Sequence, residues 1–409
     1  MSNRTAIICG TLIDGAGDDP IEDAVVICEG DRIVEVTPRE DFDANGGEVV
    51  DHSGETVMPG LIDAHLHLKG WPSMDQSDYL NYDVAAGAAR ATVHLKRLLE
   101  AGFTTVRDVD SRTALGLRTA VEEGAIPGPE IHTSHRAIYQ TGGHGDAHFL
   151  PYEWVKEYNP YDPALRDGAD ECRKEARKRI RDGVDLIKIG TTGGVLSEKD
   201  HPGQSQMTDE EIAAVTQEAH RVGIPVAAHA QGAEGIKNAL RNGVDTIEHG
   251  IYVDDEGIEL LLETDGVLVP TLAIVDRICE HGADHGIPEF GLEKAREARE
   301  AHFDAARRAY DAGVTIALGT DFVGPNLVPH GENADEAVLY VERCGMDPMD
   351  AIKVATSEAA KTLKEQEVGV VEPGRTANLV VLEEDPLAEI RALTDSVAAV
   401  YKHGDRVVG

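Results

Sequence analysis

The chain has 409 residues, 41% of them hydrophobic, which is enough for one large domain with a smaller one beside it. No apolar run approaches the roughly 18 residues of a membrane span, and the first residues lack the pattern of a secretory signal. With 75 acidic and 38 basic residues, the net charge of −37 argues against the basic face that nucleic acids require. We therefore expect a cytoplasmic protein that binds a small-molecule substrate, with no nucleic acid and no membrane as partner.

The acidic excess also bears on the solvent in which the chain folds. Lysine is scarce, and mutual repulsion among so many carboxylates is relieved where salt screens it. This composition favours a halophilic protein, and an ordinary acidic enzyme is the alternative. Five scattered cysteines, an odd number, indicate reduced thiols and no disulfide framework.

The chain before residue 58 is expected to be a small β unit. Its β-branched runs at residues 6–9, 24–28 and 32–36 are separated by turns, and no long helical period appears. Similar runs return near the other end of the chain, at residues 378–382, 397–401 and 406–408. Neither piece can bury a core alone, so we expect both to form one β-sandwich domain from residues 1–57 and 366–409.

Residues 58–365 alternate short apolar strands with longer charged segments of helical character. The expected helices include residues 85–100, 170–181, 209–222, 235–242, 292–312 and 348–363. Glycine follows several of them, as it does where a helix leads into a strand. The eight expected strands are residues 61–68, 104–109, 130–134, 186–190, 226–229, 246–249, 267–271 and 315–320. This α/β pattern predicts a (β/α)8 TIM barrel rather than a doubly wound open sheet, because no dinucleotide-binding glycine motif follows the early strands.

Two histidines stand near the end of the first expected barrel strand. His65 and His67 are two residues apart, so in a strand both imidazoles point to one face. Taken alone, the pair fits either two metal ligands or two buried histidines satisfied by hydrogen bonds.

Later strand ends favour the metal site. They carry Lys188, His229, His249 and Asp321, and the C-terminal strand ends of a TIM barrel lie on the face that holds the active site. Lys188 lies within an apolar strand, where an unpaired ammonium is costly. It is either paired with a carboxylate or converted by CO2 to a carbamate, whose oxygens can bridge two metal ions.

At this point the chain resembles the amidohydrolase superfamily over nearly its whole length. The resemblance is carried by residues 59–67, Lys188, residues 228–230, 247–250 and 319–321, and the tail at 372–381. More narrowly, the chain is similar to the imidazolonepropionase-related branch, which includes Xaa-Pro dipeptidases, other carboxypeptidase-type dipeptidases and ochratoxin-type amidases. Residues 141–146, at the start of a long loop that runs to residue 167, are similar to a loop of that branch.

The resemblance implies two divalent metal ions, with zinc expected, and a hydrolase of amide C–N bonds in dipeptides or N-acyl amino acids. Asp321 would bind the more buried ion with both histidines of the first strand, and a bridging hydroxide would attack the scissile carbonyl. Lys188 as carbamate would bridge the ions, and Asp321 would transfer the proton to the leaving amine. The second ion would be bound by His229 and His249. The resemblance implies Asp321, Lys188 and His249 as the catalytic residues. Relatives are often homo-oligomers, so we expect the same here.

The resemblance also implies two substrate-binding residues and suggests alternative functions. His144 is a candidate for binding substrate, or a loop histidine in solvent. Gln231 stands where peptidase relatives often carry tyrosine, which makes a standard dipeptide less certain. A mononuclear deaminase or an imidazolonepropionase-like cyclic amide hydrolase is an alternative, but Lys188 argues against both, and Gly232 against the deaminase. A non-catalytic metal-binding protein is the remaining alternative.

Overall fold

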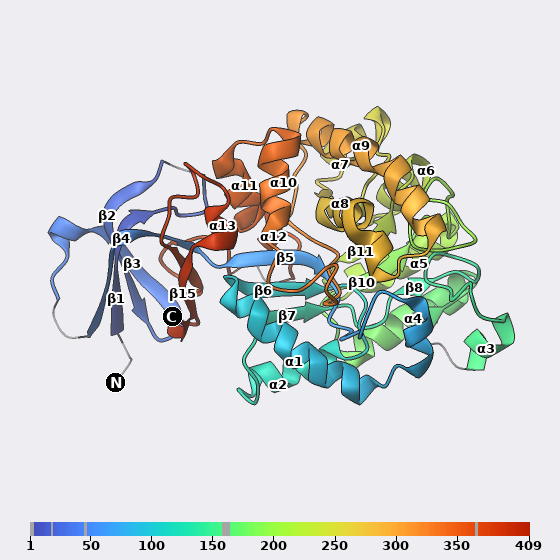
Figure 1. Cartoon of the computed structure of the whole chain (residues 1–409), viewed down its shortest axis with the longest axis horizontal. Helices are drawn as coiled ribbons and strands as arrows, with labels where there is room; N and C mark the ends of the chain where they lie inside the picture. Colours follow the sequence, from blue (N-terminus) through green and yellow to red (C-terminus); the bar gives the residue numbers. More distant parts are fainter. Residues whose placement is uncertain (1–3, 18, 45–46, 158–163, 365–366) are drawn as a thin grey trace.

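The computed structural model describes residues 4–17, 19–44, 47–157, 164–364 and 367–409. A sheet built from both ends of the chain lies at one end of the molecule, and the alternating strands and helices lie at the other (Figure 1). The expected domain boundary near residues 365 and 366 falls outside the described residues.

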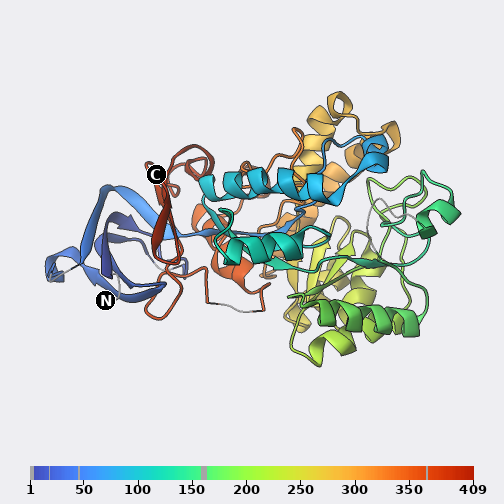
Figure 2. The same cartoon turned by 90° about the horizontal axis from the view of Figure 1, so that it is seen from below.

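Among the described residues, the terminal sheet has seven strands in the order β16-β15-β14-β4-β1-β2-β3. Their bounds are β1 (Arg4–Leu12), β2 (Ile21–Glu29), β3 (Arg32–Pro38), β4 (Glu48–Pro59), β14 (Leu379–Leu382), β15 (Val397–Lys402) and β16 (Asp405–Val408). Strand β4 pairs parallel to β1 and antiparallel to β14, so it joins the first and last parts of the chain. The prediction that the two termini build one β unit is therefore confirmed, and both are at that end in Figure 2.

The long strand β4 was not predicted from the sequence. Polar residues and Gly54 interrupt its middle and hide the alternation of a half-buried strand. The strand leads straight into the barrel through Pro59 and Gly60. A Cβ atom on Gly60 would lie 2.2 Å from Thr104 Oγ1, so only glycine fits where the chain passes from the sheet to the barrel.

In the part of the chain that the structure describes, seven parallel strands and one extended segment make up the barrel. The strands are β5 (Leu61–Leu66), β6 (Phe103–Asp108), β7 (Glu130–Thr133), β10 (Ile187–Gly190), β11 (Val226–Ala230), β12 (Thr246–His249) and β13 (Val267–Val269). The amide N–H of Asp185 donates to Thr133 O at 2.9 Å and so joins the two groups of strands. The barrel predicted from the alternation is thus observed.

The expected eighth strand is an extended segment rather than a regular strand. Ile316 makes only an isolated bridge to Leu268, yet the segment still closes the barrel. The amide of Ala64 donates to Leu318 O at 2.7 Å, and the amide of Leu268 donates to Thr315 O at 2.9 Å. Two short strands that were not predicted, β8 (Ile138–Tyr139) and β9 (Ala164–Leu165), extend the sheet beyond β10.

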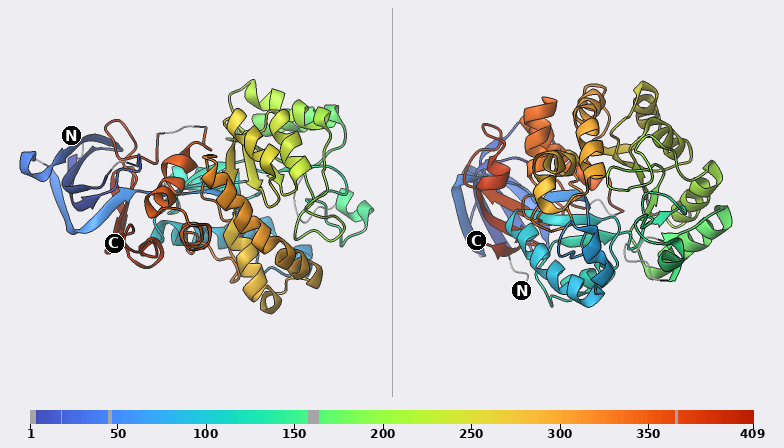
Figure 3. Two further views of the ribbon diagram at one scale, coloured as in Figure 1. Left: turned by 90° about the horizontal axis from the view of Figure 1, so that it is seen from above. Right: turned by 45° about the vertical axis from the view of Figure 1, so that its right-hand side comes forward.

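Helices lie around the barrel strands and beside the terminal sheet (Figure 3). They are α1 (Val84–Glu100), α2 (Ala114–Glu122), α3 (Tyr152–Glu157), α4 (Ala169–Asp182), α5 (Asp209–His220), α6 (Ala233–Arg241), α7 (Asp255–Glu263), α8 (Leu272–His281), α9 (Glu289–Asp311), α10 (Asp335–Cys344), α11 (Pro348–Val354), α12 (Ser357–Ala360) and α13 (Ala392–Asp395). Gly102, Gly183, Gly223, Gly243 and Gly313 follow helices with φ between +71° and +86°, as glycine C-caps do. Among the described helices, none combines the length and apolarity that crossing a membrane requires.

Candidate metal centre

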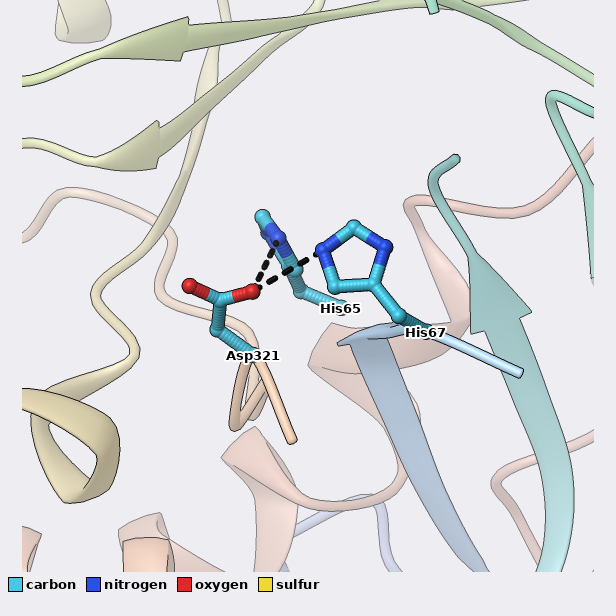
Figure 4. A group of neighbouring side chains, drawn as sticks. All are labelled: His65, His67 and Asp321. Carbon is cyan, nitrogen blue, oxygen red and sulfur yellow. Dashed lines mark ion pairs between the residues drawn. The ribbon is translucent and has the colours of Figure 1, made fainter. Parts of the chain in front are cut away.

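Three side chains form a metal-binding site at the C-terminal ends of the barrel strands (Figure 4). His65 lies in β5, His67 follows it, and Asp321 follows the extended segment. Asp321 Oδ1 lies 3.5 Å from His65 Nε2 and 2.9 Å from His67 Nε2. Their three ligand atoms all lie within 4.8 Å of one another. Two imidazoles and a carboxylate at this spacing suit a divalent transition metal.

The backbone is bent to bring Asp321 into this group. Its φ is +58°, the left-handed conformation that costs a non-glycine residue energy. The amide of Asp321 donates to His65 O at 2.7 Å, which fixes the carboxylate over β5. Beneath it, Asp63 accepts hydrogen bonds from Asn333 at 2.6 Å and from the hydroxyl of Thr320 at 2.7 Å. Burial nevertheless raises the pKa of Asp63 to about 6.

The orientation of His65 is set by Glu248, the residue before His249. His65 Nδ1 lies 2.5 Å from Glu248 Oε2, and Arg107 Nη2 donates to Glu248 Oε1 at 2.7 Å. Burial alone would raise the pKa of Glu248, but the charges of Arg107 and Lys188 hold it well below its usual range. Glu248 is therefore an anion that only accepts, so His65 carries its proton on Nδ1 and keeps the lone pair of Nε2 for a metal.

Two further histidines lie beside this site, at the ends of β11 and β12. The ring centroid of His249 is 5.0 Å from that of His65 and 4.7 Å from that of His229. His229 Nε2 lies 3.1 Å from the carbonyl of Gly193, an acceptor, which leaves Nδ1 with a lone pair. His249 Nδ1 lies 2.7 Å from Thr271 Oγ1. Burial lowers the pKa of both histidines well below the usual value, so both are neutral, as metal ligands must be.

The surroundings of Lys188 in β10 test whether this side chain fits a carbamate that bridges two metal ions. Its side chain is buried, and its Nζ has no hydrogen-bond partner among the described residues. Burial lowers its pKa to about 8, although Glu248 and Asp321 attract its charge. Within the described part of the chain, no carboxylate lies within ion-pairing distance of Lys188, so the sequence alternative of a paired lysine is not what the structure shows. A buried amine without a partner fits a residue that is completed by CO2 and metal ions.

The two candidate substrate-binding residues, His144 and Gln231, differ in their surroundings. His144 stacks on His229 with ring centroids 3.9 Å apart and planes 10° apart, so it is not a loop histidine in solvent. Gln231 follows β11, and its buried Oε1 has no hydrogen-bond partner among the described residues. The backbone N–H of Gln231 donates to Thr192 Oγ1 at 2.9 Å.

A cavity opens above the metal site. It encloses about 960 Å³, counting the solvent at its open mouth, and reaches down to His67, Asp321 and His144. Its walls are largely apolar and include Trp71, Met74, Tyr79, Phe149, Leu196, Ile274, Ile287 and Val323. Polar residues line it as well, among them Lys69, whose Nζ donates to Asp110 Oδ2 at 2.9 Å. Part of the long loop at residues 141–167 therefore lines the cavity, while residues 158–163 lie outside the described part of the chain.

The sequence did not predict the roles of Glu248 and Arg107. The signal for Glu248 is a carboxylate directly before His249, near the end of an expected strand. Alternation along a strand puts neighbours on opposite faces, so the two side chains would not be expected in one site. The φ of +74° at His249 breaks the alternation and lets both contribute. The sequence around Arg107 does not indicate which residue it pairs with, because its partner Glu248 is distant in the chain.

The comparisons with known proteins agree with this geometry. The model of the Amidohydrolase family matches residues 56–407. Ochratoxinase from Aspergillus niger is 32% identical over 419 aligned positions, which cover 98% of this chain and 86% of the relative. An imidazolonepropionase from Streptomyces griseus is 25% identical, covering 95% of this chain and 93% of the relative.

Solved structures extend the likeness to three dimensions. The crystal structure of the A. niger ochratoxinase has a TM-score of 0.91 and 31% identity, covering all of this chain and 96% of the other. A crystal structure of a Xaa-Pro dipeptidase with methionine bound in its active site has a TM-score of 0.90 and 34% identity, with both chains fully covered. On these matches and the His/His/Asp site, the chain belongs to the amidohydrolase family, as a metal-dependent enzyme that acts on C–N bonds.

Proposed function

We propose that the protein is a binuclear zinc amidohydrolase that cleaves the amide bond of a dipeptide or an N-acyl amino acid. The observation that carries the proposal is the buried Nζ of Lys188, which has no partner among the described residues and whose charge acts on Asp321, His229 and His249. His65, His67 and Asp321 form one group of candidate ligands, and His229 and His249 form the other. A second ion and a carbamate together would give this amine its partners.

Each ligand in the proposed site comes from this chain. His65, His67 and Asp321 would hold one ion, His229 and His249 would hold the other, and Lys188 would contact both. Carbamate formation is the addition of the lysine nitrogen to CO2, which forms a C–N bond and releases one proton from the nitrogen. A pKa lowered to about 8 by burial leaves part of the amine neutral and able to react at physiological pH. Two such ions supply Lewis acidity for the scissile carbonyl and a nucleophile at neutral pH.

The protein's own residues then handle protons and geometry. Asp321 accepts the proton of the attacking water and returns it to the nitrogen of the leaving amine. The adjacent imidazoles of His65 and His67 hold the pKa of Asp321 well below its usual range despite its burial. Glu248 keeps His65 in the tautomer that the site needs.

The apolar cavity supports a substrate with a large apolar side chain. Trp71 and Tyr79 stack with ring centroids 4.1 Å apart and form part of the apolar wall of the cavity. Burying one aromatic or leucine side chain against such a wall is worth about 1.5–3 kcal/mol. The names of the relatives, an ochratoxinase and a Xaa-Pro dipeptidase, support an amide substrate.

A substrate screen with the zinc-loaded protein in molar KCl tests the proposal. The panel pairs N-acetyl-phenylalanine and N-acetyl-leucine with N-acetyl-glycine, and Ala-Phe and Ala-Pro with Ala-Gly. We expect hydrolysis that is lost on chelation and restored by zinc, with the larger side chains preferred. Two zinc ions per chain are expected by elemental analysis. Zinc-loaded protein that hydrolyses none of these amides, or that holds one ion at saturation, would refute the binuclear assignment.

A further inference from the structure

His144 is tied twice to the loop that joins β10 to α5. Its ring Nδ1 lies 3.0 Å from Ser197 Oγ, and its backbone N–H donates to Gln206 Oε1 at 3.0 Å. One tie fixes the ring and the other fixes the backbone. A histidine in an irregular segment is thereby held in one orientation against His229.

Both ties converge on the carboxylate of Asp200. Its Oδ1 accepts the hydroxyl of Ser197, and its Oδ2 accepts Gln206 Nε2 at 2.9 Å. The amide N–H of Gly194 also donates to Oδ1, at 3.1 Å. Asp200, Ser197 and Gln206 are buried, with 5–7% of each residue exposed, so these hydrogen bonds face little competition from water.

The loop that carries this network is anchored from outside the barrel. Lys294 in α9 points its ammonium into the loop and donates to the carbonyls of Gly194, Ser197 and Asp200 at 3.2, 2.6 and 2.5 Å. All three hydrogens of the ammonium are thus matched by backbone acceptors. The positions of Ser197 and Asp200 are therefore fixed independently of His144.

Counting hydrogens assigns the protonation of the His144 ring. A carboxylate only accepts, so the single hydroxyl hydrogen of Ser197 points to Asp200. Ser197 Oγ can then only accept from His144, which places the imidazole hydrogen on Nδ1. The other ring nitrogen, Nε2, keeps its lone pair.

The packing of the ring shows which edge remains for a ligand. A Cβ atom on Gly194 would lie 2.1 Å from His144 Nδ1 and 2.3 Å from Cε1, so Gly194 leaves just enough room for that edge. One face is covered by His229. His144 still lines the cavity, and with one face and the Nδ1–Cε1 edge covered, its free parts are the opposite face and the edge that carries Nε2 and Cδ2.

We propose that Asp200, acting through Ser197 and Gln206, is a positioning residue that holds His144 with an unprotonated Nε2 turned to the cavity. Neutral His144 then accepts a hydrogen bond from an N–H or O–H group of the substrate and does not donate one. This proposal rests on the proposed function for its kinetic consequence only. The ring tautomer is a property of the folded chain and is measured without turnover.

The decisive test is the tautomer of His144 in zinc-loaded protein labelled with 15N in its histidine rings. The spectrum of His144→Gln identifies the signals of His144 by their loss. In the wild type, Nδ1 is expected to resonate as a protonated nitrogen and Nε2 as an unprotonated one. Ser197→Ala removes the acceptor, so the signals should move toward the Nε2–H tautomer. Ser197→Thr keeps a hydroxyl and should preserve the wild-type pattern.

Kinetics and a matched control complete the experiment. Ser205→Ala removes an exposed hydroxyl from the same loop and should leave both the spectrum and the rates unchanged. Ser197→Ala and Asp200→Asn should lower kcat/KM about 10-fold at unchanged zinc content, the scale typical of residues that orient a functional histidine. A wild-type His144 protonated on Nε2, or a Ser197→Ala spectrum identical to wild type, would overturn the proposal. If no substrate is found at all, the spectra still decide it, and only the proposed function fails.

Discussion

Replacing Glu248 by glutamine tests how the barrel interior supports the metal site. Glu248 offers two acceptor oxygens, one to His65 Nδ1 and one to Arg107 Nη2 and Thr246 Oγ1. Glutamine has nearly the same shape but only one acceptor oxygen, since its other terminal atom is an NH2 donor. One of the two sides must therefore lose its partner.

Either placement of the amide has a cost that the structure sets. If the oxygen stays with Arg107, the NH2 group faces His65 and favours the tautomer with hydrogen on Nε2, which removes a metal ligand. In either placement Arg107 keeps a buried charge without its counterion, because glutamine is neutral and both side chains are fully buried. If the oxygen turns to His65, Arg107 also faces the NH2 group. Breaking a buried pair in this way costs about 3–5 kcal/mol of stability. Loss of an outer partner of a metal-bound histidine typically lowers metal affinity about 10–100-fold.

The assay is a zinc titration against a competing chelator, followed by thermal unfolding of the metal-free protein. We expect Glu248→Gln to lower zinc affinity about 10–100-fold, to lower the unfolding temperature, or to do both. Glu259→Gln is the matched control, because Glu259 is exposed on α7, the helix that follows β12. A Glu248→Gln protein that matches this control in both measurements would show that Glu248 does not orient His65.

Four other outcomes are expected. Lys188→Ala should lose zinc and activity, and short carboxylic acids should restore part of both by supplying the missing carboxylate; failure of any rescue would count against the carbamate. Asp321→Asn should keep most of its zinc but lose about 10²–10⁴-fold in kcat, and near-normal turnover would remove Asp321 from proton transfer. Burial lowers the pKa of His94 to about 4. The unfolded chain therefore binds a proton there between pH 6.5 and 4 while the folded chain does not, so stability falls as the pH falls through this window. Between pH 7 and pH 5, the free energy of unfolding measured in denaturant titrations should fall by about 2 kcal/mol less in His94→Gln than in the wild type. Equal decreases in the two proteins would refute this burial effect. Finally, the net charge of −37 predicts a higher melting temperature in molar KCl than in dilute buffer, and equal values would refute the halophilic assignment.

The barrel was predictable because its signals are local. An apolar strand, or a glycine after a helix, is recognised from a few neighbouring residues. Together these patterns predict the alternation of strands and helices in a TIM barrel. Strand β4 was missed because its pairing depends on β1 and β14, which lie far from it in sequence. The segment at residues 315–320 was expected as a regular strand, but its bends and partners are set by β5 and β13 on either side.

The metal ligands were predictable for a different reason. His65, His67 and Asp321 are polar residues at the ends of apolar strands, so their positions alone point to the active face of a barrel. Residues that orient other side chains of the site carry no such mark. Ser197 and Asp200 lie in a loop rich in polar residues, and only the folded structure shows which of them reach His144.

The backbone at the strand ends explains why the ligands and their supports occupy one site. His249, Thr271 and Asp321, each at or just beyond the end of a barrel strand or of the closing segment, have φ values of +74°, +58° and +58°. Conformations of this kind cost about 1–3 kcal/mol each in a non-glycine residue. Glycine would remove the cost but would also remove the side chain that the site uses. The surrounding contacts maintain the strained conformations instead: Thr271 Oγ1 contacts His249 Nδ1, and the Asp321 backbone N–H donates to His65 O.

The bend at His249 also lets Glu248 and His249 serve the same site from adjacent positions, which a regular strand would forbid. The metal centre therefore depends on local distortions of the barrel, and those distortions are maintained by hydrogen bonds among the residues that form it.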